Sequence, residues 1–240
     1  MMRVSLQPAF ILHCRPYRET SLLLDVFTQE YGRIALIARG VRKNRSKIRP
    51  LLQPFFPLVI SWQGKTELMT LQLAEPQGTP IFLRGECLLS GFYLNELLVR
   101  LLQKQDPHPQ LYTIYHHTLL ELGQPALQQK YLRLFEKKLL DELGYGLQLN
   151  HSIPDGKVFQ ANQLYRFYPE RGFELVDGNE TPSSGTIFRG KSLLALASEQ
   201  LDDEMSLQEI KRLMRIALGG LLGPQPLQSR RLFTGIIGAC

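Results

Sequence analysis

The sequence predicts an α+β protein in which a small five-stranded β-barrel is followed by a helical domain that carries a small antiparallel β insert. In residues 1–80, short segments rich in Val, Ile, Leu and Phe are separated by turn-forming residues, which is typical of a small β domain. From residue 87 the apolar residues recur with the helical period of about 3.6, and residues 145–186 interrupt this period. We therefore expect two domains, residues 1–80 and 81–240, with the insert at about residues 145–186.

The N-terminal segment is expected to form five short strands. Alternation is clearest in ELMTLQL, residues 67–73, where one face is apolar and the other is polar. Five strands in this length fit a closed or nearly closed barrel of the OB type, which leaves no exposed strand edge. An SH3-like barrel has the same number of strands and stays an alternative. The predicted strands are residues 9–14, 20–27, 33–38, 57–62 and 67–74.

The helical domain is expected to begin with three helices. Residues 87–103 are apolar on most sides, which indicates a helix that is buried in a bundle. Residues 111–122 form a second helix that ends at Gly123, because glycine readily adopts the conformation that follows a helix. A third helix, residues 126–143, ends in the same way at Gly144.

The remaining elements are a β-hairpin and two further helices. Ser206 and Glu209 have the spacing of a capping box, in which two side chains bond to the free amide groups at the start of a helix. This spacing predicts that the last helix begins at Ser206. The predicted elements are strands at residues 164–168 and 172–176 and helices at residues 191–199 and 206–222.

The composition points to a protein of the cytoplasm. The first residues lack the apolar core and the cleavage site of a signal peptide, and no stretch is long and apolar enough to cross a membrane. The three cysteines, Cys14, Cys87 and Cys240, are odd in number and far apart, so no disulfide framework is expected. We therefore expect a cytoplasmic location in a reducing environment and no membrane association.

A basic run, RIALIARGVRKNRSKIR, extends from Arg33 to Arg49 and holds seven Arg or Lys and no Asp or Glu. Residues 1–80 contain 11 Lys and Arg against 5 Asp and Glu, whereas residues 81–240 contain 17 of each. The net charge of +6 therefore comes from the N-terminal third. Such uncompensated charge attracts a polyanion, and more strongly at low salt. A basic loop that is merely solvated is the competing interpretation.

The string GTIFRGKS, residues 185–192, fits the phosphate-binding pattern G-x-x-x-x-G-K-[ST]. A loop of this kind follows a buried strand and directs backbone amides at a phosphate from the start of a helix. Here the preceding residues are turn formers that include a proline, and too few residues follow for a parallel sheet. A P-loop nucleotide hydrolase is therefore kept only as an alternative function.

Metal binding and covalent catalysis have less support still. The chain contains no C-x-x-C and no G-x-S-x-G. The adjacent His116 and His117 point about 100° apart on a helix, so they do not easily share an ion. His13 and Cys14 would face opposite sides of a strand. The sequence therefore predicts no enzyme, no cofactor and no metal site.

Nucleic-acid binding explains the basic run best. Barrels of the OB type hold the phosphates of a single strand in a positive groove and stack its bases on aromatic rings. Tyr31 and Trp62, which both lie next to turn residues, are the expected stacking residues. A second basic set shares one face of the last helix because of its i, i+3, i+4 spacing. The predicted DNA-binding residues are Arg33, Arg39, Arg42, Lys43, Arg45, Lys47 and Arg49 in the run, Lys211, Arg212 and Arg215 on the helix, and Arg230 behind it.

Several further strings are spread along the chain. They are AFILH, RPY and ETSL near the N-terminus, GRI and ARGVR in the basic run, LQPF after it, YLNEL in the first helix, LGYG after the third, and the residues Leu132, Arg133, Phe135, Glu136, Ser229, Arg230, Leu232 and Phe233. Together, and in this order, they resemble the RecO family of bacterial recombination mediators over nearly the full length. The resemblance implies an OB barrel followed by a helical domain with a small insert.

The resemblance also implies a function in DNA repair and recombination after DNA damage. It implies binding of single- and double-stranded DNA, annealing of complementary strands, and cooperation with RecR in loading RecA onto DNA that is coated by single-stranded DNA-binding protein. It implies a cytoplasmic, nucleoid-associated protein that is not an enzyme. A protein-interaction adaptor that does not bind DNA, with the basic run as solvated surface, stays the other alternative.

The resemblance further implies that the helical domain docks the acidic C-terminal tail of single-stranded DNA-binding protein. An apolar tail that ends in a carboxylate needs a cation beside an apolar groove. The residues expected there are the cations Arg133, Lys130 and Lys137 and the groove residues Tyr131, Leu134 and Phe135. Some members of the family carry a four-cysteine zinc site in the insert, but residues 145–186 contain no cysteine, so we expect this insert to fold without metal.

Overall fold

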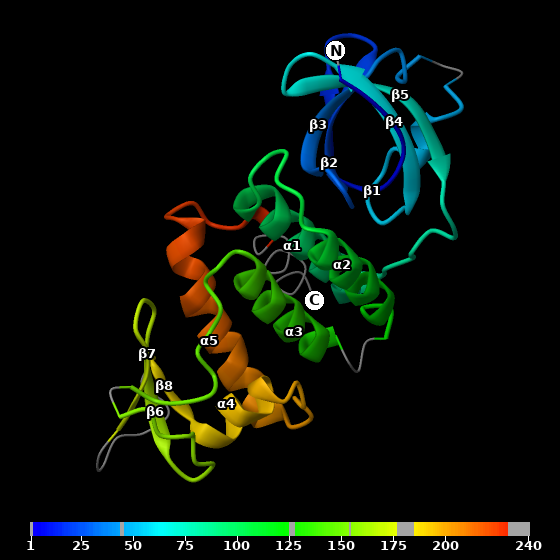
Figure 1. The fold of residues 1–240 in the computed structure, drawn as a ribbon. Coiled ribbons are helices and arrows are strands. Elements are labelled where there is room, and N and C mark those ends of the chain that lie inside the picture. The colour runs from blue at the N-terminus through cyan, green and yellow to red at the C-terminus, as the bar shows by residue number, and fades with distance from the viewer. Residues whose placement is uncertain (1, 44–45, 125–127, 154, 177–184, 230–240) are drawn as a thin grey trace. The chain divides into compact units, whose positions relative to one another are not determined.

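The computed structural model describes residues 2–43, 46–124, 128–153, 155–176 and 185–229 (Figure 1). The chain divides into two compact units. One consists of Met1–Pro125 and Pro226–Cys240, and the other of Ala126–Gln225. The domain boundary near residue 80 stays a prediction.

The first unit contains a closed barrel of five strands. Its strands are β1 (Met2–Tyr17), β2 (Ser21–Thr28), β3 (Gly32–Ala38), β4 (Leu58–Gly64) and β5 (Leu68–Pro76). They follow the order β1-β2-β3-β5-β4, in which β4 also pairs with β1 and only the pair of β3 and β5 is parallel (Figure 1). This arrangement confirms the predicted barrel of the OB type.

Strand β1 is much longer than the six residues predicted for it, because it closes the barrel. Its N-terminal part pairs with β4 and its C-terminal part with β2, and the register shifts between Val4 and Gln7 and between Ile11 and His13. Leu6 lies in the first of these irregularities with a φ of 53°. Bulges of this kind bend a strand so that it can join two neighbours around a barrel.

The barrel is filled by the alternate side chains of its strands. Leu24, Leu36, Leu58 and Trp62 are among the fully buried members of this core. The opposite face of β1 and β2 packs against helices α1 (Gly85–Leu101) and α2 (Pro109–Glu121). Both faces are therefore buried where the helices cover these strands, at residues 9–12 of β1 and 26–28 of β2, and the sequence of β1 there is continuously apolar.

Aromatic rings join the outer face of the barrel to α2. Phe10 of β1 and Phe27 of β2 lie 5.3–6.1 Å, between ring centroids, from Tyr112 and Tyr115. Asn95 of α1 donates a hydrogen bond to the carbonyl of Leu12 (2.9 Å) and accepts one from the Tyr115 hydroxyl (2.6 Å). These contacts fix the helical layer on the barrel within this unit.

The second unit contains three helices and a small antiparallel sheet. Helix α3 (Gln128–Glu142) and helix α5 (Glu204–Leu222) lie close to the predicted bounds, as does α4 (Gly190–Ala197). The sheet has the order β7-β6-β8, with β6 (Leu164–Tyr168), β7 (Gly172–Leu175) and β8 (Ile187–Arg189). Aromatic side chains form its core. The ring centroid of Phe159 lies 4.7 Å from that of Tyr165 and 5.5 Å from that of Phe173. No described helix is long and apolar enough to span a membrane.

The sequence argument against a phosphate-binding loop in this unit is confirmed. The middle of the string at residues 185–192 is strand β8, which pairs antiparallel with β6, so the string does not form a phosphate-binding loop. The predicted capping box is wrong. Asp203, not Ser206, caps α5 by accepting from the Ser206 amide at 3.0 Å. The Glu209 carboxylate instead accepts hydrogen bonds from the backbone and the side chain of Arg189.

Candidate nucleic-acid interface

The basic run lies on β3 and on the connection between β3 and β4, residues 39–57, as the sequence predicts. This connection is anchored by apolar side chains. Val41 and Leu52 are buried in the barrel core, and Ile48 and Leu51 pack against it. Apolar residues therefore fasten both halves of the connection, and its charged residues are held on a folded surface rather than on a loose loop.

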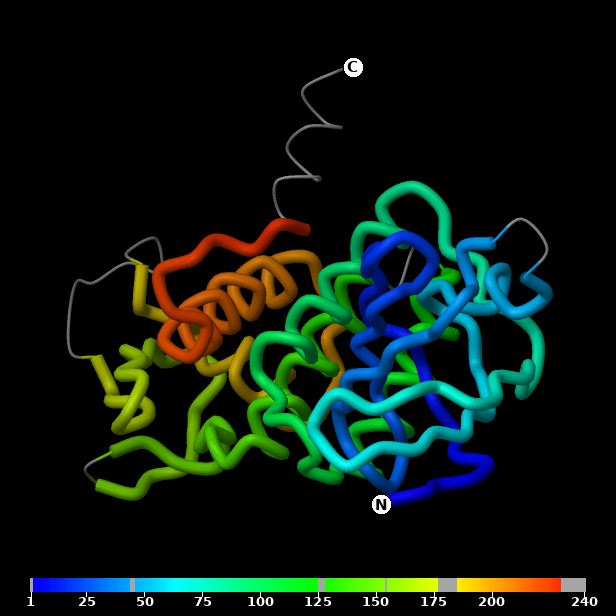
Figure 2. The backbone as a smooth tube through the Cα atoms, turned by 90° about the horizontal axis from the view of Figure 1, so that it is seen from above, coloured from blue at the N-terminus to red at the C-terminus, as the bar shows by residue number. Residues whose placement is uncertain are grey.

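The connection runs from one end of the barrel to the other. It starts after Ala38, which pairs with Leu22 beside the hairpin between β1 and β2. It ends at Leu58, which pairs with Ala9, and Ala9 also pairs with Thr28 at the far end of β2. Strand β2 has eight residues, so the connection covers about 25 Å along the barrel. Figure 2 shows it on the outside of the strands.

Four cations of the connection face the solvent. The side chains of Arg39, Lys43, Lys47 and Arg49 are exposed. The turn that presents the first two is shaped by Gly40, whose φ is +70°, and closed by a hydrogen bond from the Lys43 amide to the Gly40 carbonyl (3.2 Å). Arg45 lies outside the described residues. We call the surface formed by these four exposed cations the basic track.

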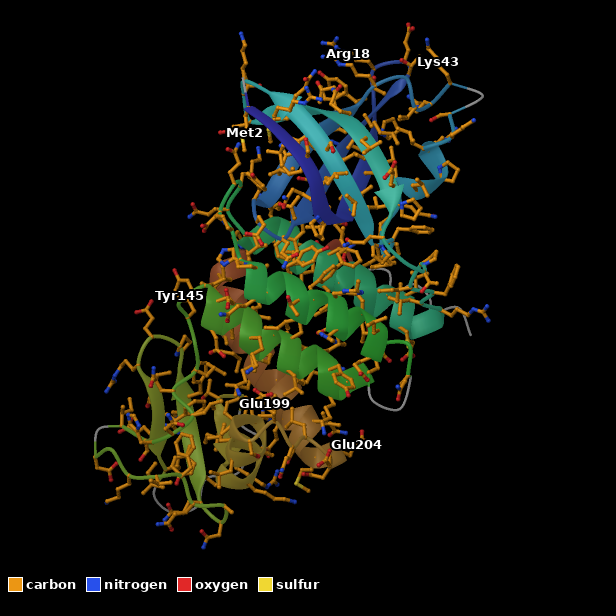
Figure 3. The ribbon with its side chains drawn as sticks, turned by 45° about the vertical axis from the view of Figure 1, so that its right-hand side comes forward. Met2, Arg18, Lys43, Tyr145, Glu199 and Glu204 are labelled. Atoms are coloured by element: carbon orange, nitrogen blue, oxygen red, sulfur yellow. The ribbon has the colours of Figure 1, made fainter. Side chains whose placement is uncertain are left out.

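Arg42 links the basic track to the hairpin between β1 and β2. Its amide donates to the Thr20 carbonyl at 2.9 Å. Its guanidinium donates to the carbonyls of Arg18 (3.0 Å) and Glu19 (3.2 Å). Arg18 is exposed and lies at the same end of the barrel as Lys43 (Figure 3). Arg18 was missed by the sequence analysis, because only the pairing of the strands brings this hairpin beside the connection.

Arg33 has a structural role. Its guanidinium donates to the Asp25 carboxylate (3.1 Å) and to the Leu102 carbonyl (3.1 Å), and its side chain is only 13% exposed. Asp25 therefore holds an arginine within the barrel unit. Arg33 is therefore not part of the basic track.

The expectation that Trp62 stacks on bases is wrong. Its side chain is fully buried in the barrel core. Tyr31 is half-buried and packs edge-on against the Trp62 ring, with 5.3 Å between the ring centroids. Trp62 therefore belongs to the barrel core and Tyr31 packs against it, because the alternation of side chains along β4 turns position 62 inward.

The basic set on α5 is divided between two roles. Lys211 and Arg215 are exposed. The Arg212 guanidinium instead lies 4.7 Å from the centre of the Phe188 ring and donates to the Ile187 carbonyl, so it joins α5 to the small sheet. Arg230 lies outside the described residues.

The residues predicted to bind a partner's tail lie on α3, but most of them are buried or form ion pairs with other residues of this chain. Arg133 is buried and forms an ion pair with the fully buried Glu136 (2.9 Å). Phe135 is also buried, whereas Tyr131 and Leu134 are half-buried. The two lysines bind acidic residues of the connection between α4 and α5. Lys130 pairs with Asp202 (2.6 Å) and Lys137 with Glu199 (3.0 Å).

Two models of one protein family match this chain. The N-terminal model of Recombination protein O matches residues 2–79, and the C-terminal model matches residues 84–231. DNA repair protein RecO of Coxiella burnetii is 48% identical over 230 residues, which cover 96% of this chain and 98% of the relative. The RecO protein of Nitrosococcus oceani is 47% identical over 231 residues, 96% of this chain and 93% of the relative. That of Polynucleobacter necessarius is 44% identical over 235 residues, 96% of each chain.

Proposed function

This chain belongs to the RecO family of DNA repair proteins, and from that premise we propose that it is a recombination mediator that binds DNA along the basic track and catalyses no reaction. The observation that carries the proposal is the anchoring of the basic track by Val41 and Leu52. Because the backbone beneath these cations is already ordered, phosphate binding does not have to fix it, and the charge is concentrated along one line of the barrel.

The basic track would contact phosphates without reading bases. Lysine and arginine side chains that meet phosphates position a nucleic acid but carry no sequence information. A surface that neutralises two strands at once also lowers the repulsion between them. We therefore propose that the protein binds single- and double-stranded DNA and anneals complementary strands, and that it acts with RecR to load RecA onto DNA coated by single-stranded DNA-binding protein.

The salt dependence of binding tests the basic track. For single-stranded DNA, each phosphate contact contributes about −0.7 to the slope of log affinity against log salt. We expect Lys43→Ala to make this slope shallower by about 0.7, because one contact is lost. The measurement is a fluorescence-anisotropy titration of a labelled oligonucleotide at four or more salt concentrations.

Lys65→Ala is the matched control, since Lys65 is an exposed lysine in the turn between β4 and β5. Its slope should equal that of the wild type. Equal slopes for all three proteins would exclude Lys43 from the interface, and binding that does not change with salt would rule out the proposed function.

We also propose that α3 takes the acidic tail of single-stranded DNA-binding protein at Lys130 and Lys137. Their spacing places them on one face of the helix with Leu134 between them. Glu199 and Asp202 already hold these lysines, so an incoming carboxylate must compete with them. Hydrogen bonds from Lys138 and Lys137 keep the pKa of Glu199 below its ordinary value, against the opposing effect of burial. Glu199 is thus an ionised competitor at neutral pH.

Removing this competitor should strengthen tail binding. Exposed ion pairs contribute about 0.2–1 kcal/mol, so we expect Glu199→Gln to bind a tail peptide roughly two- to five-fold more tightly. Isothermal titration calorimetry with the peptide measures the effect. Glu170→Gln, which removes the same charge from an exposed site in this unit, should leave the affinity unchanged. Weaker binding by Glu199→Gln would place the tail elsewhere.

A further inference from the structure

One aromatic side chain of the barrel unit is almost completely exposed. Phe82, on the connection between β5 and α1, is 79% exposed, and Phe92 on α1 is 36% exposed. Their neighbours Leu83 and Gly91 are buried. Large exposed apolar groups that gather on a soluble protein commonly mark a binding surface.

Phe92 and Leu83, the residue after Phe82, belong to one close-packed cluster. Phe55 lies against Gly91, where an added Cβ would come within 2.8 Å of the Phe55 ring and 2.7 Å of the Leu83 side chain. A larger residue at position 91 would require the Phe55 and Leu83 side chains to shift. The Phe55 and Phe92 rings are 5.3 Å apart between centroids and inclined at 59°. Phe55 is itself buried, whereas Phe92 is 36% exposed and Phe82, next to the buried Leu83, faces the solvent.

Backbone hydrogen bonds attach the segment that leads to Phe82 to the end of the connection between β3 and β4. The Ile81 amide donates to the Phe55 carbonyl (3.0 Å), and the Gln77 amide donates to the Pro57 carbonyl (2.8 Å). Phe82 therefore follows directly after the point where the two connections meet. Arg49 lies upstream on the same connection, and Arg84, two residues after Phe82, is exposed. Glu75 near the end of β5 and Glu86 in the first turn of α1 are exposed acidic residues of this region.

We propose that Phe82 is a stacking platform for the nucleobases of single-stranded DNA whose phosphates lie on the basic track. The proposal rests on the proposed function and adds the residues that hold the bases. Single-strand binders combine a positive groove for the backbone with aromatic rings for the bases, and every base offers a face for stacking. The exposed cations of the basic track, whose connection ends beside this segment, together with Arg84 favour a nucleic acid over an apolar protein partner.

An abasic oligonucleotide separates stacking from charge. It has the phosphates of the normal strand but no bases. We expect Phe82→Ala to bind a normal oligonucleotide roughly 5- to 100-fold more weakly than the wild type, because one stacked base is lost. Its affinity for the abasic oligonucleotide and the salt slope should not change, since no phosphate contact is removed. Phe82→Trp should restore tight binding.

Tyr145→Ala is the matched control, since Tyr145 is a 61% exposed aromatic residue of the other unit. It should bind both oligonucleotides as the wild type does. If Phe82→Ala does so too, the platform is overturned, although the basic track still stands. If this variant instead loses only the binding of a protein such as RecR, Phe82 belongs to a protein interface and the platform is likewise overturned. If the wild type binds neither oligonucleotide at low salt, the platform and the proposed function fail together.

Discussion

Replacing Arg39, Lys43 and Lys47 together with glutamate is expected to lower the affinity for single-stranded DNA by at least about 100-fold at low salt. An exposed cation that meets a phosphate contributes on the order of 1 kcal/mol, and about 1.4 kcal/mol corresponds to a factor of ten in affinity. Three lost contacts therefore give about 100-fold, and the new negative charges repel the phosphates in addition. Strand annealing should be lost with the binding.

The loss must be separated from a defect in folding and from a change in net charge. All three side chains are exposed, so the unfolding transition should stay where it is in the wild type. Reversal of three exposed charges elsewhere, at Arg3, Lys65 and Arg171, changes the net charge equally. If the two triple variants lose affinity to the same extent, binding follows net charge and the basic track has no special role. Binding of the tail peptide should survive in both.

Gly32→Ala is expected to destabilise the barrel unit by roughly 3 kcal/mol or more, because a clash is added to an unfavourable backbone conformation. Gly32 has a φ of +62°, and a Cβ there would lie 1.9 Å from the Asp106 carbonyl oxygen. The turn between β2 and β3 cannot move away freely. The Gln105 amide donates to the Arg33 carbonyl (2.8 Å), and Arg33 in turn binds the Leu102 carbonyl.

Gly40→Ala separates the two contributions. Gly40 also has a positive φ, +70°, but no heavy atom of the described residues lies within 4 Å of a Cβ built there. Gly40→Ala should therefore lower the free energy of unfolding only by the cost of the unfavourable backbone conformation, about 1–2 kcal/mol. Urea unfolding followed by the fluorescence of Trp62 measures both, since this single tryptophan lies in the barrel core. Equal losses for the two variants would show that the contact with Asp106 yields easily.

Much of the fold could be predicted from the sequence because its signals are local. The five strands of the barrel and the helices α1, α2 and α3 begin and end within a few residues of their predicted bounds, apart from the N-terminal extension of β1. The alternation of a strand and the period of a helix are visible in neighbouring residues. The short strand β8 escaped prediction, because three residues are too few to show a period and only its pairing with β6 defines it.

The misplaced side chains share a different cause, which is contact with distant parts of the chain. Glu209 binds Arg189 across 20 positions instead of the helix start that its spacing suggested. Trp62 lies beside turn residues in the sequence, yet the closure of the barrel buries it. Phe82 carried no sequence signal, because only the tertiary structure shows that it is exposed while Leu83 beside it is buried near Gly91.

The basic run shows most clearly which properties belong to the sequence and which are decided by the tertiary structure. Its charge, its lack of acidic residues and its place after the third strand are properties of the sequence alone. Which of its cations can meet a phosphate was decided only by the tertiary structure. Arg33 is held by Asp25 and by Leu102, which is 69 positions away, whereas Arg39, Lys43 and Lys47 stay exposed because Val41 and Leu52 fill the barrel core beneath them. Charge is a property of the residue, but its availability depends on burial and ion pairing, and these arise only when distant segments pack together.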